Sequence, residues 1–95
     1  MDFDFQDYLE EQLQDPEFAK RYSELEPARH IAQQVIMLRQ KEGITQAELA
    51  KRVGTQQSAI SRLENASSVP SLSFVQRVAQ ALGADIHVIL EPQAT

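Results

Sequence analysis

Residues 45–65, TQAELAKRVGTQQSAISRLEN, decide the fold of this chain because they hold start and stop signals for two short helices. Thr45 and Glu48 have the spacing of a capping box, in which the hydroxyl and the carboxylate each bind a free backbone N–H at the start of a helix. A first helix is therefore expected to begin at Gln46. Gly54 stands where this helix can end in the left-handed conformation, which glycine adopts without steric cost. The stretch predicts two helices joined by a tight turn.

The second of these helices is expected from Gln56 to Asn65, with Thr55 as its cap. Ile60 and Leu63 form its inward side, because they recur at helical spacing. Its other face carries amide, hydroxyl and guanidinium groups without a carboxylate, namely Gln56, Gln57, Ser58, Ser61, Arg62 and Asn65. Such groups can hydrogen-bond base edges and phosphates, so this face predicts contact with DNA.

Individual contacts follow from the chemistry of the side chains. Gln57 suits adenine, and Arg62 suits guanine or a phosphate. Gln46 lies at the start of the first helix, where its amide and the free backbone N–H groups can point at a phosphate oxygen. Thr55 and Asn65 complete the expected phosphate contacts, which would fix the register of the protein on the duplex.

This stretch, with a helix before it and PSLSFVQRVAQALG after it, resembles the helix-turn-helix domain of the xenobiotic-response-element family, which includes the lambda-type phage repressors. The resemblance covers residues 28–83, and its motif positions are occupied by Leu49, Ala50, Val53, Gly54, Ile60 and Leu63. Ala66 stands where the family often has glycine, so the exit from the second helix is expected to turn less sharply. The resemblance implies a mostly α, lambda-repressor-like helical bundle that binds double-stranded DNA. The alternative is a helix-turn-helix that packs without binding DNA.

Two further helices are expected to complete the bundle. Residues 28–42 have a broad apolar face, and Gly43 follows them as a stop signal. The second helix would be capped by Ser71 and end before Gly83. Packed around the stretch at 45–65, they predict a four- or five-helix bundle.

Length and composition limit the class of protein. A chain of 95 residues builds one small domain with a modest core. Without cysteine it has neither disulfides nor thiolate metal sites, and no apolar run approaches the roughly 18 residues of a membrane span. The first residues are acidic where a signal peptide would be basic, which predicts a cytoplasmic protein with no membrane contact.

An enzyme is not expected. His30 and His87 stand apart, which is more typical of packed or solvated residues than of catalysts or metal ligands. The sequence has no glycine-rich phosphate loop, no nucleophile motif and no cluster of residues at metal-ligand spacing. We therefore predict no catalytic residue, no metal and no cofactor.

The net charge of −5 argues at first against DNA binding, but its distribution reverses that impression. Residues 1–27 carry nine acidic residues against Lys20 and Arg21, a balance of −7. Residues 28–83 carry seven basic residues against three acidic ones, a balance of +4. This asymmetry predicts an acidic arm at 1–27, a DNA-binding body at 28–83 and a tail at 84–95.

The arm is predicted to form two short helices separated by Asp15 and Pro16, which can end one helix and start the next. Five of the six aromatic residues of the chain lie in its first 22 positions. Either both arm helices fold back on the basic body, or the arm docks on a basic partner protein. On the second interpretation, the partner-binding residues are Phe5, Tyr8, Leu9, Phe18 and Tyr22.

The tail changes to a period of two. Residues 85–90, DIHVIL, place Ile86, Val88 and Leu90 on one face, which predicts a β-strand. Because the sequence offers no second strand, this one is expected to pair with its copy across a dimer, making these three the dimerisation residues. Two recognition helices about 34 Å apart would then read a palindromic operator. The alternative is a tail folded on its own bundle.

The whole layout, with an arm that contains LQDPEFAKRYSELEP, resembles antitoxins of the HigA type from bacterial toxin–antitoxin modules. This resemblance implies a repressor of its own promoter that also neutralises a small basic ribonuclease toxin. The alternative is a free-standing phage or bacterial regulator whose arm only packs.

Overall fold

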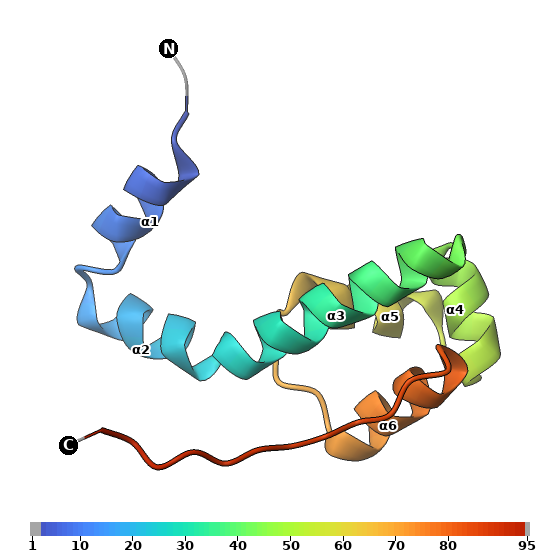
Figure 1. The fold of residues 1–95 in the computed structure, drawn as a ribbon. Helices are drawn as coiled ribbons and strands as arrows, with labels where there is room; N and C mark the ends of the chain where they lie inside the picture. Colours follow the sequence, from blue (N-terminus) through green and yellow to red (C-terminus); the bar gives the residue numbers. More distant parts are fainter. Residues whose placement is uncertain (1–2, 95) are drawn as a thin grey trace.

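The computed structural model describes residues 3–94, so the first two residues of the predicted arm and the last residue of the tail lie outside it. Within the described residues the regular structure is helical (Figure 1). The helices are α1 (Phe5–Gln12), α2 (Pro16–Glu24), α3 (Glu26–Glu42), α4 (Gln46–Val53), α5 (Gln57–Asn65) and α6 (Leu72–Ala81). The prediction of a mostly α fold built on a helix-turn-helix is confirmed.

The local signals in the sequence place the ends of α4 correctly. The Thr45 hydroxyl accepts a hydrogen bond of 3.1 Å from the backbone N–H of Glu48, so α4 begins at Gln46 as predicted. Gly54 ends the helix at a φ of 81°, in the left-handed region. Its N–H and that of Thr55 both donate to the carbonyl of Ala50, at 2.9 Å each, which closes the turn toward α5.

Two predictions at the ends of α5 are wrong. Thr55 does not cap this helix, because the chain is still turning there and Gln56 takes the N-cap position without a side-chain hydrogen bond. The helix therefore begins at Gln57. At the other end, Ala66 adopts the left-handed conformation, at φ 53° and ψ 37°. The exit is consequently as sharp as one made by glycine, and the methyl group adds a steric cost that glycine would avoid.

The core of the body is formed where α3, α4, α5 and α6 meet. Leu49 of α4, Ile60 of α5 and Val78 of α6 are completely buried, and each comes from a different helix. The cluster around them consists of Val35, Ile44, Ala50, Leu63 and Leu82. This core fixes α5 with its apolar side inward, which leaves the polar side at the surface.

The arm stands apart from this bundle. Helix α1 buries none of its residues and projects beyond the start of α3 (Figure 1). The interpretation in which both arm helices fold back on the body is therefore wrong for α1. Helix α2 joins α3 through Arg29, whose guanidinium lies 3.5 Å from the ring centroid of Tyr22 and donates to the Tyr22 carbonyl at 2.8 Å.

The tail is not a strand in this chain. Within residues 3–94 there is no second strand to exchange backbone hydrogen bonds with residues 85–90, so the predicted β-strand and its ladder do not form. Ala84 still donates its N–H to the carbonyl of Ala79, at 2.8 Å. Beyond it the tail runs back along α3 and α6 with Ile86 half-buried, which agrees with the alternative of a tail folded on its own bundle.

Candidate nucleic-acid interface

The outer face of α5 carries the side chains that the sequence assigns to DNA. Five of them are exposed, namely Gln56, Gln57, Ser58, Arg62 and Asn65. Thr55, Ser61 and Gln46 are half-buried at the edges of this surface. Since Ile60 and Leu63 hold the opposite side of α5 in the core, the exposed set lies along one continuous polar face.

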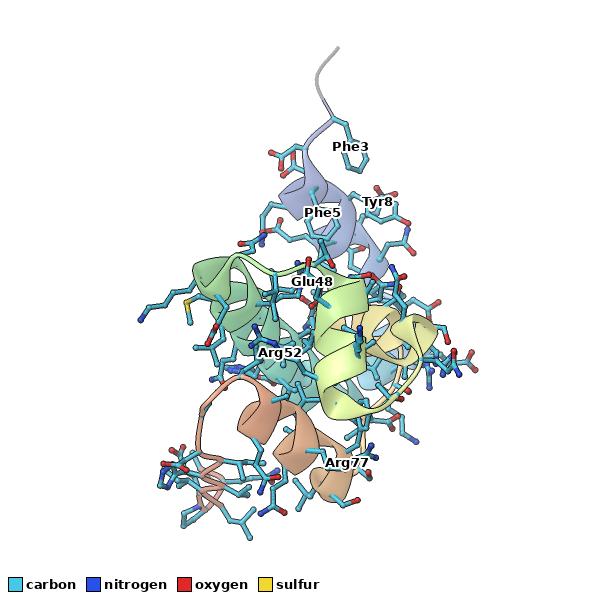
Figure 2. The ribbon with its side chains drawn as sticks, turned by 90° about the vertical axis from the view of Figure 1, so that its right-hand side faces the viewer. Phe3, Phe5, Tyr8, Glu48, Arg52 and Arg77 are labelled. Carbon is cyan, nitrogen blue, oxygen red and sulfur yellow. The ribbon has the colours of Figure 1, made fainter. Side chains whose placement is uncertain are left out.

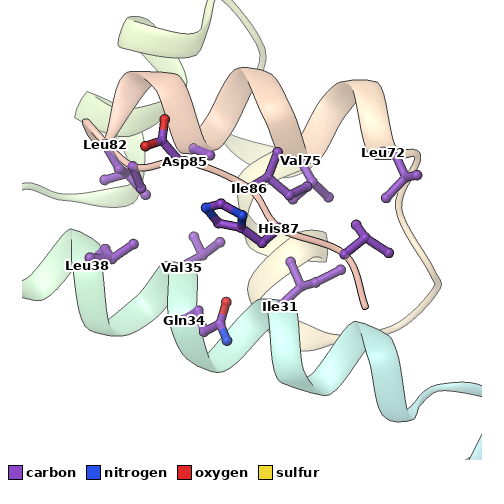
Figure 3. Close-up of a pocket in the computed structure, with 13 residues that line it drawn as sticks. Ile31, Gln34, Val35, Leu38, Leu72, Val75, Leu82, Asp85, Ile86 and His87 are labelled. Carbon is purple, nitrogen blue, oxygen red and sulfur yellow. The ribbon is translucent and has the colours of Figure 1, made fainter. Parts of the chain in front are cut away.

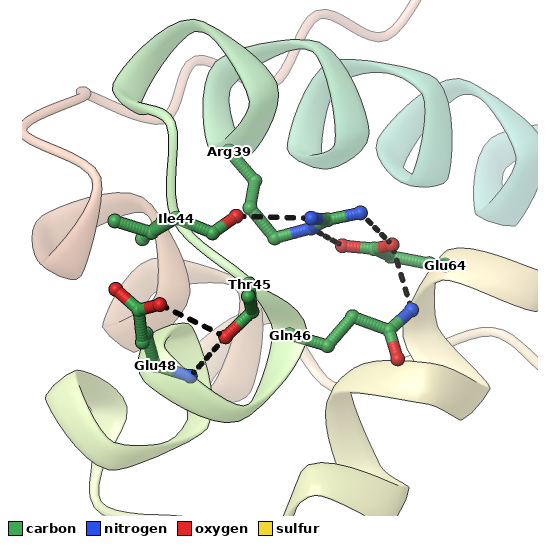
Figure 4. A network of polar contacts seen from close by, with 6 residues as sticks. All are labelled: Arg39, Ile44, Thr45, Gln46, Glu48 and Glu64. Atoms are coloured by element: carbon green, nitrogen blue, oxygen red, sulfur yellow. Dashed lines mark hydrogen bonds and ion pairs between the residues drawn. The ribbon is translucent and has the colours of Figure 1, made fainter.

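The acidic residue of α5, Glu64, is withdrawn from this face (Figure 4). Its side chain is only 4% exposed, and its carboxylate accepts hydrogen bonds from Arg39 Nε at 2.7 Å and Arg39 Nη2 at 3.0 Å. Arg39 also donates through Nη1 to the carbonyl of Ile44 at 3.0 Å. The hydrogen bond to Glu64 raises the pKa of the Arg39 guanidinium above its usual value. A buried and neutralised carboxylate does not repel a phosphate backbone, so α5 presents no negative charge outward.

Gln46 belongs to the same network. Its Nε2 donates to Glu64 Oε1 at 2.9 Å, so the nitrogen that was expected to contact a phosphate is already engaged (Figure 4). At this end of α4 the groups that remain for a phosphate are the backbone N–H groups of the first helical turn. A direct phosphate contact by the Gln46 side chain stays a prediction.

Sequence reasoning missed the pair of Arg39 and Glu64. The two residues are 25 positions apart, and each lies on a helix whose polar side could face water. Two further basic residues are also held by the fold: Arg77 donates to the carbonyl of Val53 at 3.0 Å, and Arg52 lies 3.6 Å from the carboxylate of Glu42. Arg52 belongs to α4 itself, and Arg77 reaches the end of α4 from α6 (Figure 2).

Arg62 differs from these other arginines. It is exposed on the polar face of α5, and among residues 3–94 its guanidinium pairs with no carboxylate. It is therefore a positive charge that remains available to a ligand, in the last turn of α5.

The residues predicted to bind a partner protein do not form one surface. Phe5 and Tyr8 of α1 are 63% and 46% exposed (Figure 2), and Phe3, which sequence reasoning left out, packs beside Tyr8 with ring centroids 5.7 Å apart. Leu9 is half-buried. Phe18 and Tyr22 stack on each other within α2, at 6.2 Å between ring centroids, and Arg29 covers Tyr22. Of the five residues predicted to bind a partner, Phe5 and Tyr8 are exposed and the other three are half-buried.

In residues 3–94 there is no group of three or more histidine, cysteine or acidic residues placed to hold a metal ion. No helix in that part of the chain is long and apolar enough to cross a membrane.

Comparison with known proteins identifies relatives of this chain. Antitoxin HigA1 of Mycobacterium tuberculosis is 39% identical over 77 residues, which cover 81% of this chain and 52% of that protein. The transcriptional regulator SinR of Bacillus subtilis is 31% identical over 62 residues, 64% of this chain and 56% of that protein. The chain thus spans about half the length of the curated relatives it matches. As regulators and antitoxins, these relatives support the expectation that the chain is not an enzyme.

A solved structure has a similar fold. A chain of the toxin–antitoxin module from Streptococcus pneumoniae superposes with a TM-score of 0.57 at 24% identity, over 95% of this chain and 94% of that one. Residues 35–89, more than half of the chain, match the helix-turn-helix family. This range contains α4, the turn at Gly54 and α5, where the predicted resemblance was strongest. The chain belongs to the helix-turn-helix family of DNA-binding proteins.

Proposed function

We propose that this chain is a transcriptional repressor that recognises a specific DNA sequence through α5. The observation that carries the proposal is the outer face of α5, where polar side chains and an available Arg62 are exposed while Glu64 is buried against Arg39. A helix of this kind enters the major groove and reads base edges from its exposed side. Gln57 would bind adenine, and Arg62 would bind guanine or a phosphate.

The remaining residues of the face position the protein on the duplex. Thr55 before α5 and Asn65 at its last position would contact phosphates, together with Gln46 and the backbone N–H groups at the start of α4. A homodimer would place two copies of α5 one helical turn apart, so the operator would be palindromic. Such a regulator would act in the cytoplasm.

The experiment that tests DNA recognition compares two arginine variants. DNA selected from a random pool would be titrated with the wild-type chain, Arg62→Ala and Arg52→Ala, using fluorescence anisotropy. Arg62→Ala should weaken binding by about 1 to 3 kcal/mol if the side chain reads a base. Arg52→Ala removes the same charge from the side of α4 and should have a much smaller effect. If both variants lose the same binding affinity, Arg62 acts only as a non-specific positive charge. If selection from the random pool yields no preferred sequence, the proposal is refuted.

We further propose that the chain is the antitoxin of a toxin–antitoxin module and neutralises a small basic ribonuclease toxin. The similarity to antitoxin HigA1 supports this role, as does the acidic arm with exposed Phe5 and Tyr8. Acidic side chains around an apolar helix face favour a basic partner with an apolar groove. The similarity to SinR supports the second candidate, a free-standing regulator without a toxin.

Growth of a bacterial host separates these two candidates. A small basic protein encoded beside this chain would be expressed alone and then together with the wild-type chain or its variants. Relief of growth arrest by the wild type supports the antitoxin role. Phe5→Asp should lose that relief, whereas Met37→Asp, at a similarly exposed apolar residue of α3, should keep it. If the wild type gives no relief, the free-standing regulator is the better assignment.

A further inference from the structure

Helix α6 packs against other elements on two sides. On one side, Val75 and Leu82 line a groove of about 160 Å³ between α6, α3 and the tail (Figure 3). On the other side, Phe74 and Val78 pack into the hydrophobic core, where α6 contacts α4. Arg77 follows Phe74 by three residues, so it lies at the edge of this second side, beside the end of α4 (Figure 2).

The Arg77 side chain reaches the turn between α4 and α5. Its Nη2 donates at 3.0 Å to the backbone carbonyl of Val53, the last residue of α4. A β-carbon at Gly54 would lie 3.9 Å from the same nitrogen, so the guanidinium lies against the turn itself. Among residues 3–94, no carboxylate lies within ion-pair distance of Arg77. Its contact with the described chain is therefore directed at the backbone of this turn.

The Val53 carbonyl receives no hydrogen bond from the backbone of residues 3–94. The last four carbonyls of a helix have no partner inside it. At the end of α4, the two N–H groups that follow the helix donate to the carbonyls of Ala50 and Lys51 instead. Arg77 thus supplies a donor where the backbone supplies none, and its positive charge is favourable at the C-terminal end of a helix.

The start of α5 depends on this turn for its position. Gln56 takes the N-cap position without a side-chain hydrogen bond, and Gln57 is the first residue of the helix. No side-chain cap therefore fixes the direction from which Gln57 leaves α5. A side chain that reads a base must be held by its supporting contacts to within about 0.5 Å. Arg77, from a third helix, holds the α4 end of the turn that carries this side chain.

We propose that Arg77 is a positioning residue for DNA recognition, which holds the turn through Val53 and so sets where Gln57 meets the bases. The inference rests on the proposed function, because it names a residue that supports the reading face without belonging to it. The competing role is a direct contact between Arg77 and a DNA phosphate. Salt dependence separates the two roles. A phosphate contact adds about one to the slope of log affinity against log salt concentration, whereas a contact inside the protein adds nothing.

Fluorescence anisotropy of the full chain, with selected DNA and with a scrambled duplex over a series of salt concentrations, tests this assignment. Arg77→Ala should weaken binding to the selected DNA about threefold to tenfold, and should leave binding to the scrambled duplex and the salt slope unchanged. Arg77→Lys should recover most of the loss, because an ammonium can donate to a single carbonyl. Arg52→Ala is the matched control, since it removes a positive charge from the last turn of α4, where Arg52 lies near Glu42. It should keep the wild-type ratio of the two affinities.

A loss that is equal on both duplexes, with a lower salt slope, would overturn the inference in favour of a phosphate contact. Unchanged affinity of Arg77→Ala for the selected DNA would overturn it as well. Circular dichroism would confirm that each variant is folded.

Hydrogen exchange of the free protein separates this inference from the proposed function. Arg77→Ala should speed exchange of the Gly54 and Thr55 amides at least about threefold, because their hydrogen bonds to Ala50 close the turn. Faster exchange in a chain that selects no preferred DNA sequence would refute the proposed function and leave the contact at the turn standing. Unchanged exchange in such a chain would refute both.

Discussion

Arg39 of α3 and Glu64 of α5 form a two-point ion pair, with Nε–Oε2 and Nη2–Oε1 distances of 2.7 and 3.0 Å. Only 16% of the Arg39 side chain and 4% of the Glu64 side chain are exposed. A planar guanidinium that meets a carboxylate at two points fixes orientation as well as distance. The pair therefore sets the angle of α5 on the bundle and keeps its one carboxylate away from the outer face.

Breaking this pair from one side should be costly. Glu64→Ala leaves the Arg39 guanidinium mostly buried without its counter-ion and removes the acceptor of Gln46. Loss of one partner of a buried pair typically costs 3 to 5 kcal/mol, and we expect about 3 kcal/mol because Arg39 keeps some exposure. Urea unfolding followed by circular dichroism measures the loss. A change below about 0.5 kcal/mol would show that water replaces the carboxylate without penalty.

Replacing both partners should have a different effect. Arg39→Met with Glu64→Leu leaves no unpaired charge, so its stability should lie close to that of the wild type. Because the folded-state pKa of Arg39 is raised, the stability from this group is present at every pH below its unfolded pKa. It is lost only as pH rises through the raised value. The difference between wild type and double variant should thus stay constant from neutral to mildly alkaline pH.

Ala66 offers the opposite change, a substitution that stabilises. Its φ of 53° lies in the left-handed region, which glycine enters without steric cost. Ala66→Gly should raise the free energy of unfolding by about 1 kcal/mol, which is a shift of roughly 4 to 8 °C in the melting temperature for a domain of this size. Ala47→Gly, at an exposed position in the first turn of α4, is the matched control and should lower stability, because glycine loses more backbone freedom than alanine on entering a helix. Equal destabilisation by both substitutions would contradict the steric cost assigned to Ala66.

Arg29 should hold α2 in place. Its guanidinium contacts both the ring and the backbone carbonyl of Tyr22, and so links α3 to α2. Arg29→Ala should therefore lower the hydrogen-exchange protection of the α2 amides about tenfold or more, since a charged hydrogen bond and a cation–π contact are lost together. Arg29→Lys should restore little, because an ammonium does not reproduce the planar contact.

The comparison for this prediction is Arg21→Ala, an exposed residue of α2 that loses the same charge. It should leave the exchange rates of α2 unchanged. DNA binding through α5 should be the same in the wild type and in all three variants. Equal exchange of α2 in the Arg29→Ala variant and the wild type would show that other contacts hold the helix.

The sequence predicts most of the body because its signals are local. The Thr45 cap and the glycine at 54 act within a few residues, and each stands at the expected end of α4. Only half of the predicted capping box forms, because the Glu48 carboxylate accepts from the Thr45 hydroxyl, at 3.2 Å, and not from a backbone N–H. The bounds of α5 are shifted because Gln56 rather than Thr55 is the N-cap, a choice made by the geometry of the turn. Ala66 shows the reverse case, where the packing of the connected helices imposes a conformation that its side chain disfavours.

Contacts between distant segments could not be read from the sequence in this way. Arg39 and Glu64 meet only after α3 and α5 have packed, and neither position has a local signal for its partner. The alternation in residues 85–90 predicts a strand, but a strand also needs a neighbour, and the described chain supplies none.

Helix α2 ends at Glu24 and α3 begins at Glu26, so Leu25 alone connects the arm to the body. A long flexible linker would let a bound protein sample many positions around the DNA. A single connecting residue, with Arg29 of α3 hydrogen-bonded to Tyr22 of α2, instead restricts the angle between the two helices. A protein held by Phe5 and Tyr8 of α1 would also depend on residues 13–15, which connect α1 to α2. One held on α2 itself would keep one orientation relative to the operator. Whether it clears the duplex or collides with it would then depend on the angle at this joint, and a substitution there could change gene regulation without touching either binding surface.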